Sequence, residues 1–166
     1  MKWYLQVLKS YADFSGRSRR KEYWMFFLFN LLISIILSII DIVLGLDNIS
    51  FLGGTVFRNN GIIGSIYSLL VFIPSLAVGV RRLHDTNRSG WFLLLPFSPF
   101  LLFLISPFLG KIGFALLFMG YLTIIVFAIV LLVLLLTKSD EGSNDYGPNP
   151  KDEERSRMIH KDLLDN

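Results

Sequence analysis

Four long apolar segments constrain this chain more strongly than any other feature of its sequence. They cover residues 24–44, 62–80, 91–109 and 112–136, and Asp41 is the only charged residue in them. About 20 apolar residues in a helix cross a hydrocarbon core of roughly 30 Å, whereas buried strands of soluble proteins are only about 4–8 residues long. The sequence therefore predicts an all-α, polytopic membrane protein with four transmembrane helices.

The third apolar segment differs from the others in its proline content. It contains Pro96, Pro99 and Pro107, and only Gly110 and Lys111 separate it from the fourth segment. Proline removes a backbone donor and kinks a helix, which a membrane protein tolerates where neighbouring groups satisfy the freed carbonyls. We expect a kinked third span or, alternatively, a re-entrant one, which would move the C-terminus to the other side of the membrane.

The composition excludes several classes of protein. Charged residues make up 17% of the 166 residues, compared with about 25% in an average soluble domain. This low charge content excludes a disordered chain and argues against a soluble single domain. The absence of cysteine excludes disulfides, thiolate metal sites and thiol nucleophiles, and the two histidines are His84 and His160. We therefore expect no metal site, no cofactor and no nucleic-acid partner.

The distribution of lysine and arginine indicates the orientation of the chain. Residues 1–23 contain six basic and two acidic side chains, residues 81–90 contain three arginines and one aspartate, and residues 45–61 contain one charge of each sign. Because Lys and Arg remain on the cytoplasmic side of a membrane, we expect the N-terminus and the loop 81–90 to be cytoplasmic. An even number of spans puts the polar tail on the same side.

The chain divides into three regions in this interpretation. Residues 1–23 form a basic cytoplasmic segment, and the apolar and polar side chains of its first 14 residues recur at helical spacing, which predicts a helix in the headgroup plane. Residues 24–136 form the transmembrane helical bundle. Residues 137–166 form a polar tail with a turn-rich start and the composition of a short helix over 151–164.

Two basic stretches, residues 14–24 and 81–91, each end in a tryptophan that opens a span. They bring together candidates for an anion site, a lipid-binding site or an ion-pair network: Arg17, Arg20, Glu22, Arg81, Arg82, His84, Asp85 and Arg88. Three interpretations are open. The charges serve only the topology, or they bind the phosphate of a lipid headgroup. In the third, Glu22 pairs with an arginine of 81–88, and Asp85 with one of 17–20.

The adjacent residues His84 and Asp85 also suggest a catalytic imidazole that a carboxylate orients. However, neighbours in sequence do not face each other on a helix, and no motif marks out a serine nucleophile. A turn or a helix cap is the favoured role for Asp85. We therefore expect no catalytic residue and no enzyme activity.

A stripe of polar side chains crosses the first apolar segment. Asn30, Ser34, Ser38 and Asp41 are spaced by four, four and three residues, so they share one face of a helix. Small and hydroxyl-bearing residues recur at similar spacing in the second segment, which favours close packing of the two helices. The alternative is a polar path for a solute or ion, because an ionisable residue inside a membrane is a functional candidate.

With these motifs in view, the chain resembles the bacterial inner-membrane family called domain of unknown function 805. The resemblance lies in MKWYLQVLKSYADFSGRSRRKEYWMFFLFN at the start, VRRLHDTNRSGW in the middle and YGPNP after the last span. It implies a small multi-pass protein of the bacterial cytoplasmic membrane. It implies no catalytic residues, because the family is uncharacterised.

Two functions are consistent with these features. The first is a membrane binding or assembly component whose basic cytoplasmic face engages anionic lipid headgroups or a membrane-protein partner. The alternative is a small transporter or channel subunit that uses the stripe from Asn30 to Asp41. Four spans enclose little volume, so such a pore would require a homo-oligomer.

Overall fold

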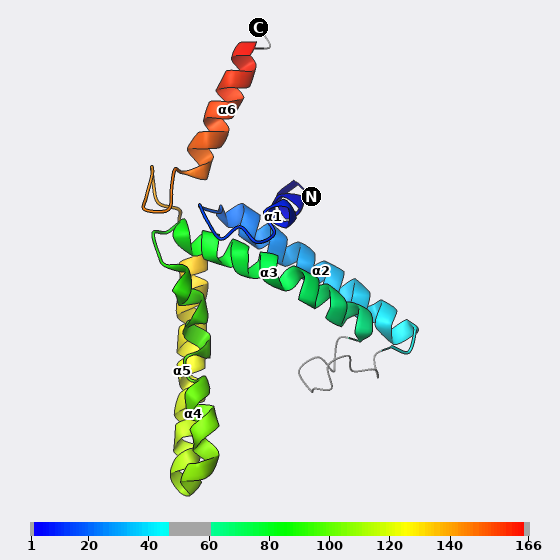
Figure 1. Ribbon diagram of the computed structural model, residues 1–166, viewed down its shortest axis with the longest axis vertical. Helices are drawn as coiled ribbons and strands as arrows, with labels where there is room; N and C mark the ends of the chain where they lie inside the picture. The colour runs from blue at the N-terminus through cyan, green and yellow to red at the C-terminus, as the bar shows by residue number, and fades with distance from the viewer. Residues whose placement is uncertain (1, 47–60, 165–166) are drawn as a thin grey trace. The chain divides into compact units, whose positions relative to one another are not determined.

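The computed structural model describes residues 2–46 and 61–164, and every regular element in these ranges is a helix (Figure 1). In chain order the elements are α1 (Lys2–Lys9), α2 (Arg20–Val43), α3 (Ile62–His84), η1 (Gly90–Phe97), α4 (Phe100–Ile105), η2 (Ser106–Leu109), α5 (Gly110–Leu136) and α6 (Pro150–Leu164), with η denoting 3-10 helix. This confirms the all-α prediction.

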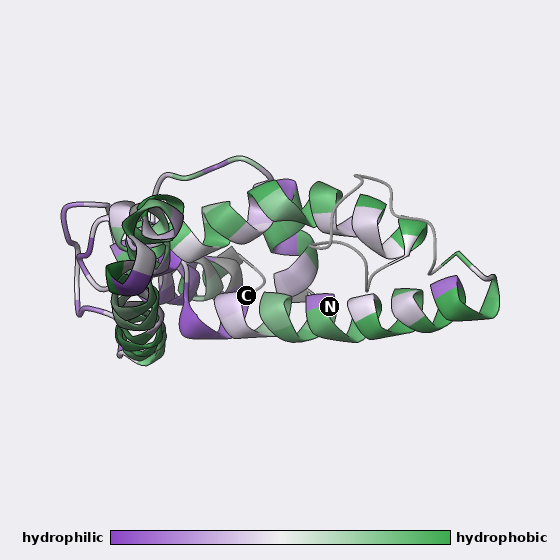
Figure 2. Ribbon diagram, turned by 90° about the horizontal axis from the view of Figure 1, so that it is seen from below, coloured by the Kyte–Doolittle hydropathy of each residue, from purple (hydrophilic) through white to green (hydrophobic). Residues whose placement is uncertain are grey.

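Three stretches of these helices are long and apolar enough to cross a membrane: α2, α3 and the stretch Gly90–Leu136. At 1.5 Å per residue, α2 and α3 are each about 35 Å long, which exceeds a hydrocarbon core of roughly 30 Å. Large hydrophobic side chains are exposed along both helices, and the ribbon in Figure 2 is coloured as hydrophobic over long stretches of the two. Such surfaces are stable when they face lipid.

The chain forms two compact units, which are described separately. The α2–α3 unit consists of residues 1–14 and 21–78, and the hairpin unit consists of residues 15–20 and 79–166.

Helix α1 packs within the α2–α3 unit through the apolar face that the sequence predicted. Val7 is buried in a cluster with Phe26 of α2 and Val78 of α3, and the ring of Tyr4 stacks on Phe26 with centroids 5.4 Å apart.

A proline in α3 explains a second contact of the N-terminal segment. Pro74 has no backbone N–H, so the carbonyl of Leu70, four residues earlier, loses its helical partner. The hydroxyl of Tyr11 donates a hydrogen bond to this carbonyl at 2.6 Å. The N-terminal segment therefore satisfies a backbone group that would otherwise be costly to leave unpaired in lipid.

The hairpin unit takes its name from residues 90–136. The elements η1, α4 and η2 run antiparallel to α5 (Figure 1): Gly113 lies against Ser106, and Gly120 lies against Phe103. The chain reverses at Gly110, whose φ of 53° is in the left-handed region. The third apolar segment is thus a series of short 3-10 and α-helical pieces, with Pro96 inside η1, Pro99 just before α4 and Pro107 in the first turn of η2, and the fourth is the continuous helix α5.

Glycine is required where α5 approaches η2. A Cβ atom at Gly113 would lie 2.0 Å from the carbonyl oxygen of Ser106, whereas a Cβ at Gly120 would meet nothing nearer than the ring of Phe103, at 3.4 Å. We predict that Gly113→Ala destabilises the hairpin by about 1–3 kcal/mol, the range for overpacking, and lowers the midpoint of thermal unfolding in detergent. Gly120→Ala is the matched control, and equal midpoints for the two variants would contradict this packing.

Candidate functional site

The residues of the second basic stretch end α3 in a defined turn. The N–H of Asn87 donates to the carbonyl of His84, and the N–H of Arg88 donates to that of Leu83, both at 3.0 Å. Asn87 has a φ of 52°, and with this pattern of bonds it ends the helix in a Schellman motif. Asparagine tolerates this conformation better than most residues do. This Schellman turn holds the side chain of Asp85 in the interior of the hairpin unit.

Asp85 binds two arginines, and we call Arg17, Arg82 and Asp85 the arginine–aspartate cluster. The Oδ1 atom of Asp85 accepts a hydrogen bond from Nε of Arg17 at 3.1 Å, and Oδ2 accepts one from Nη1 of Arg82 at 2.6 Å. All three side chains are fully buried. In such surroundings a charge is stable only when it is paired and hydrogen-bonded.

The remaining donors of Arg17 bind the segment that follows α5. Its Nη1 atom donates to the carbonyls of Gly142 and Gly147, at 2.6 and 3.3 Å, and Nη2 donates to that of Asp140 at 2.7 Å. The backbone N–H of Asp140 in turn donates to the carbonyl of Asp85 at 3.0 Å. A guanidinium has five N–H donors in a planar fork, which suits this convergence of acceptors.

Arg82 binds the C-terminus of α5. Its Nε atom donates to the carbonyl of Leu135 at 3.0 Å, and Nη2 donates to the carbonyl of Thr137. Arg20 donates a longer hydrogen bond, of 3.4 Å, to the carbonyl of Leu136. The last carbonyls of a helix have no partner within it and carry partial negative charge, so arginines from elsewhere in the chain stabilise this end of α5.

The YGPNP motif forms the outer part of the site. The ring of Tyr146 stacks on that of His84 with centroids 3.8 Å apart, and Asn144 donates to the carbonyl of His84 at 2.9 Å. Gly147 adopts a φ of 124° and contributes a carbonyl to Arg17. The side chain of Asn149 accepts a hydrogen bond from the N–H of Lys151 and thereby caps α6. Gly147 thus contacts the cluster itself, Tyr146 and Asn144 contact His84 beside it, and Asn149 begins α6.

Three segments that are distant in the sequence therefore meet in the hairpin unit: residues 15–20, 79–88 and 135–150. A further link is the N–H of Ser18, which donates to the carbonyl of Arg81 at 3.0 Å. The side chain of Arg19 pairs with Glu154 and also donates to the carbonyl of Pro150, which connects the first of these segments to α6. The stretch of residues 90–136 thus begins and ends beside this site.

The structure separates the predicted site residues by exposure. Arg17, Arg82 and Asp85 form the cluster, His84 lies beside it, and Arg81 is also buried. Arg20 and Arg88 are exposed. Glu22 is buried in the first turn of α2, and its expected pairing with residues 81–88 stays a prediction. The sequence analysis missed the roles of Asn87, Asn144 and Tyr146, for which the turn-forming residues around them were the only signal.

The polar stripe of α2 contacts α3 and α1 within the α2–α3 unit. The Oδ1 atom of Asn30 accepts a hydrogen bond from the hydroxyl of Tyr67, which is itself 3.2 Å from the hydroxyl of Tyr4. Asp41, at the other end of the stripe, is buried and accepts hydrogen bonds from the N–H groups of Ile63 at 3.1 Å and Gly64 at 2.9 Å. Ser34 is exposed and Ser38 is half-buried.

Asp41 therefore caps the N-terminus of α3 from a neighbouring helix. A carboxylate is favourable there because the first N–H groups of a helix are unpaired and carry partial positive charge. These hydrogen bonds favour the packing interpretation of the stripe, since they account for the buried carboxylate. Among the described residues, no group of His, Asp and Glu side chains could hold a metal ion.

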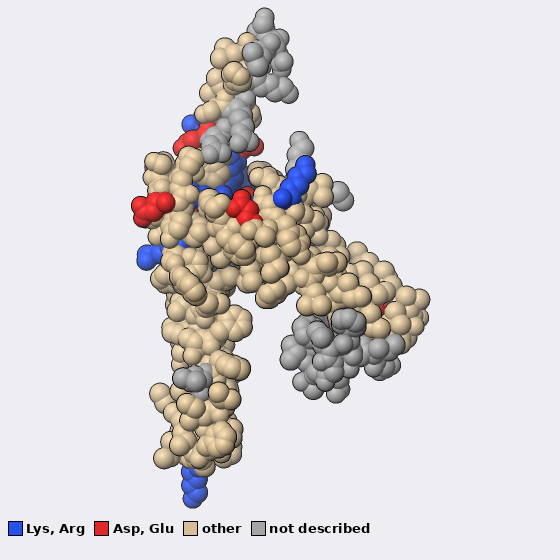
Figure 3. Space-filling model, viewed as in Figure 1, with Lys and Arg blue, Asp and Glu red and all other residues tan. Residues whose placement is uncertain are grey.

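Charged side chains gather at the end of the hairpin unit that holds the cluster, and the surface of α4 and α5 is uncharged over most of its length (Figure 3). Lys111 is the only charged residue between positions 90 and 136. Together with the apolar helices, this pattern defines the class: a multi-pass α-helical membrane protein in which polar segments of the described residues form a buried ion-pair site.

The chain belongs to the family described as "Protein of unknown function (DUF805)", whose model matches residues 11–148. Inner membrane protein YhaI of Escherichia coli strain K12 is 41% identical over 151 residues, which cover 91% of this chain and 97% of the relative. Inner membrane protein YhaH of the same strain is also 41% identical, over 91% of this chain and 98% of the relative. No solved structure matches this chain. The matched region contains the whole arginine–aspartate cluster.

The cluster generates a prediction about stability. Asp85→Asn removes the carboxylate charge and leaves the buried guanidinium groups of Arg17 and Arg82 without a counterion. Removal of one partner from a buried ion pair costs about 3–5 kcal/mol, so we expect a large fall in the unfolding midpoint in detergent. Asp145→Asn, an exposed change in the segment after α5 that contacts the cluster, is the control. A parent-like midpoint for Asp85→Asn would refute a stabilising role for the pair.

A second prediction concerns the cap on α3. Asp41→Ala leaves the N–H groups of Ile63 and Gly64 unpaired and should lower the stability by about 0.5–2 kcal/mol, the usual value of an N-cap. Asp41→Asn keeps one acceptor oxygen and should lose less. Thermal unfolding in detergent measures both, with Ser38→Ala as the control within the stripe. The capping role is wrong if Asp41→Ala unfolds at the same temperature as the control.

Proposed function

We propose that this protein is a binding or assembly component of the bacterial cytoplasmic membrane, with the cluster on the cytoplasmic side and exposed basic residues that engage anionic lipid headgroups. In this proposal the buried cluster holds the polar segments of the chain together, and the exposed residues form the binding surface. A membrane-protein partner that uses the same exposed residues is the competing proposal, and an unchanged lipid preference in the experiment below would favour it.

The orientation follows from charge and connectivity together. Residues 1–23 and 81–90 are rich in Lys and Arg, which remain on the cytoplasmic side. Contacts of residues 15–20 and 135–150 with residues 79–88 support a common side for all three segments. We therefore propose four spans, because residues 90–109 and α5 are antiparallel and each is at least about 30 Å long by helical rise.

The observation that carries the proposal is the division of the arginines into two groups. Arg17 and Arg82 use their donors on Asp85 and on backbone carbonyls, so they have little left to offer a phosphate. Arg20 and Arg88 are exposed instead, and Trp91, just after Arg88, is 77% exposed, as suits a ring at a headgroup interface. Near an anionic leaflet, each basic residue contributes about 1 kcal/mol.

The same contacts favour a non-catalytic role. The carboxylate of Asp85 binds two arginines, while the ring of His84 stacks on Tyr146 and lies 3.3 Å from the carbonyl of Gly16 through Nδ1. The side chains of His84 and Asp85 therefore contact different partners and not each other. The imidazole–carboxylate pair that would activate a nucleophile has no support in this arrangement.

Lipid retention tests the proposal. The double variant Arg20→Gln with Arg88→Gln should lose roughly 30-fold in affinity for phosphatidylglycerol, at about 1 kcal/mol per residue. Its unfolding temperature should fall much less than that of Asp85→Asn, because the variant loses only the long hydrogen bond from Arg20 to the carbonyl of Leu136. Native mass spectrometry with phosphatidylglycerol and phosphatidylcholine measures this preference. The control is Lys151→Gln with Arg155→Gln, which removes the same charge from exposed positions of α6.

Three results are distinguishable in this experiment. Loss of the phosphatidylglycerol preference in the Arg20 and Arg88 variant alone supports lipid recognition. An unchanged preference in that variant rejects it. Equal losses in the variant and the control reduce the effect to net charge, which also rejects a defined site at Arg20 and Arg88.

A further inference from the structure

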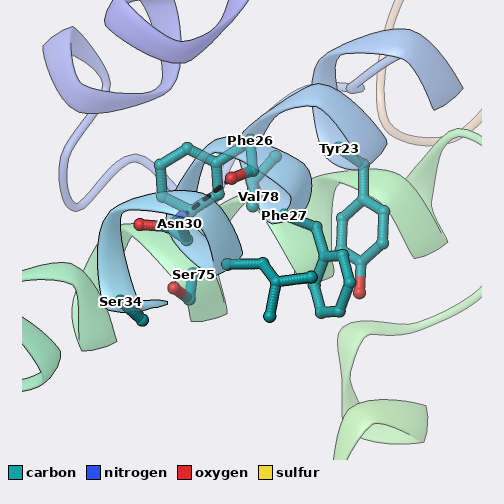
Figure 4. A pocket seen from close by; sticks show the side chains of 8 residues that line it. Tyr23, Phe26, Phe27, Asn30, Ser34, Ser75 and Val78 are labelled. Carbon is teal, nitrogen blue, oxygen red and sulfur yellow. Dashed lines mark hydrogen bonds between the residues drawn. The ribbon is translucent and has the colours of Figure 1, made fainter. Parts of the chain in front are cut away.

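Two sites that combine aromatic rings with polar side chains differ in whether they contain a group that titrates near neutral pH. The first is a pocket of about 370 Å³ within the α2–α3 unit (Figure 4). Its lining includes Tyr23, Phe27 and Asn30, and the side chain of Asn30 donates to the carbonyl of Phe26 at 2.9 Å, the dashed line in the figure. None of the residues that line this pocket is charged or is a histidine, so its lining keeps the same charge between acidic and neutral pH.

The second site is the imidazole ring of His84, in the hairpin unit. His84 lies four residues beyond the apolar segment 62–80, at the polar end of α3. Its ring is stacked on Tyr146 with an angle of 8° between the ring planes, and its Nδ1 atom is 3.3 Å from the carbonyl oxygen of Gly16. Since a carbonyl only accepts, Nδ1 carries the hydrogen, and Nε2 is the atom that takes up a further proton.

His84 is part of the contact between the end of α3 and the tail segment, which consists of residues 137–149. Besides the aromatic stack, the side chain of Asn144 donates to the carbonyl of His84 at 2.9 Å. The backbone N–H of Asp140 donates to the carbonyl of Asp85 at 3.0 Å. A change in the charge of the imidazole therefore acts directly on the boundary between α3 and the tail segment.

The tail segment covers one side of the Arg17 guanidinium. Three of its backbone carbonyls accept hydrogen bonds from the two Nη atoms, whereas the Nε atom is bound to Asp85. Release of the tail segment would free the donors that face it and leave the ion pair with Asp85 in place. Because Arg17 is fully buried in the closed arrangement, an open tail segment would present an arginine that the closed one hides.

The surroundings of the His84 ring disfavour a further positive charge. Burial lowers the pKa of His84 below its ordinary value, and the hydrogen bond to the carbonyl of Gly16 raises it only in part. Tyr146 is the titratable side chain in direct contact with the ring. Residues 15–20, 81–88 and 137–149, which surround the ring, carry seven basic and four acidic side chains: Arg17, Arg19, Arg20, Arg81, Arg82, Arg88 and Lys138 against Asp85, Asp140, Glu141 and Asp145. The closed tail segment therefore favours the neutral imidazole.

We propose that His84 and Tyr146 form a latch that keeps the tail segment closed over Arg17 while the imidazole is neutral and releases it when Nε2 is protonated. In the open state the ring is in water and has the ordinary pKa of about 6.5. The latch is therefore fully effective above about pH 6.5 and weakens as the pH falls below this value. It does not depend on the lipid binding proposed above, since neither Arg20 nor Arg88 takes part in it.

Hydrogen exchange at about pH 7.5 and about pH 5.5 tests the latch, because the amide of Asp140 exchanges only when the tail segment opens. The protein is studied in detergent, and rates are corrected for the intrinsic pH dependence of exchange. We expect the protection of this amide to fall by up to about tenfold at the lower pH, the limit set by one histidine that is protonated in the open state. The amides of Phe27 and Asn30, beside the uncharged pocket, should keep their protection. Unchanged protection of Asp140 would overturn the latch, as would increased protection, which a favourable cation–π contact with Tyr146 would produce.

Substitutions of the two histidines provide a matched comparison. His84→Gln keeps an amide donor for the carbonyl of Gly16 and is uncharged at every pH, so the protection of Asp140 should no longer differ between the two pH values. His160→Gln, an exposed change on α6, should retain the pH response of the parent protein. A response that persists in His84→Gln, or disappears in His160→Gln, would assign the titration to another group and reject the proposal.

A measurement on the parent chain covers the case in which His84→Gln fails to fold. Nuclear magnetic resonance of protein labelled at histidine gives the protonation midpoint of each imidazole, and the spectrum of His160→Gln assigns the two signals. We expect the midpoint of His84 to lie below the ordinary value of about 6.5. A midpoint at or above this value would mean that closure of the tail segment does not oppose protonation, and the latch would be wrong.

Discussion

One buried carboxylate holds together the polar part of this protein. Asp85 binds Arg17 and Arg82, and each arginine extends the contact to another segment: Arg17 to the carbonyls of residues 140–147, and Arg82 to the end of α5. A chain of apolar helices has few directional contacts with which to fix its connecting segments, because hydrocarbon packs against hydrocarbon without preference. Buried ion pairs contribute little net stability but are costly to break. The cluster therefore specifies which segments meet.

A second principle is that side chains from distant segments satisfy the backbone groups that helices leave open. The carboxylate of Asp41 caps α3, Arg82 and Arg20 bind the last carbonyls of α5, and Tyr11 binds the carbonyl that Pro74 frees. In each case a polar group that would be expensive to expose to lipid finds its partner inside the protein. These hydrogen bonds account for the polar residues Asp41 and Tyr11. The buried carboxylate of Asp41 was the reason to consider a polar path along the stripe, and the cap on α3 is another explanation for it.

The division of basic residues into buried and exposed groups changes how the two basic stretches are interpreted. The sequence suggested a single cluster of arginines, any of which could bind phosphate. Burial assigns Arg17 and Arg82 to the interior, while Arg20 and Arg88 are exposed, near the ends of spans. Recognition of a lipid, as proposed, would then depend on a small number of exposed charges. Substitution of Arg20 or Arg88 would leave the three residues of the arginine–aspartate cluster in place.

The sequence alone determined the class of the protein, since uncharged segments of about 20 residues have no stable arrangement other than helices in lipid. It also indicated the two basic stretches and the break in the third apolar segment, because proline and charge act locally. Only the tertiary structure decided that Asp85 binds both Arg17 and Arg82, that Asp41 caps α3, and that the tail returns to the turn at residues 85–88. Arg82 and Asp85 are three positions apart, but the other contacts join residues 22 to 68 positions apart. Their partners are chosen by burial and by the geometry of donors and acceptors in three dimensions, which a one-dimensional pattern does not contain.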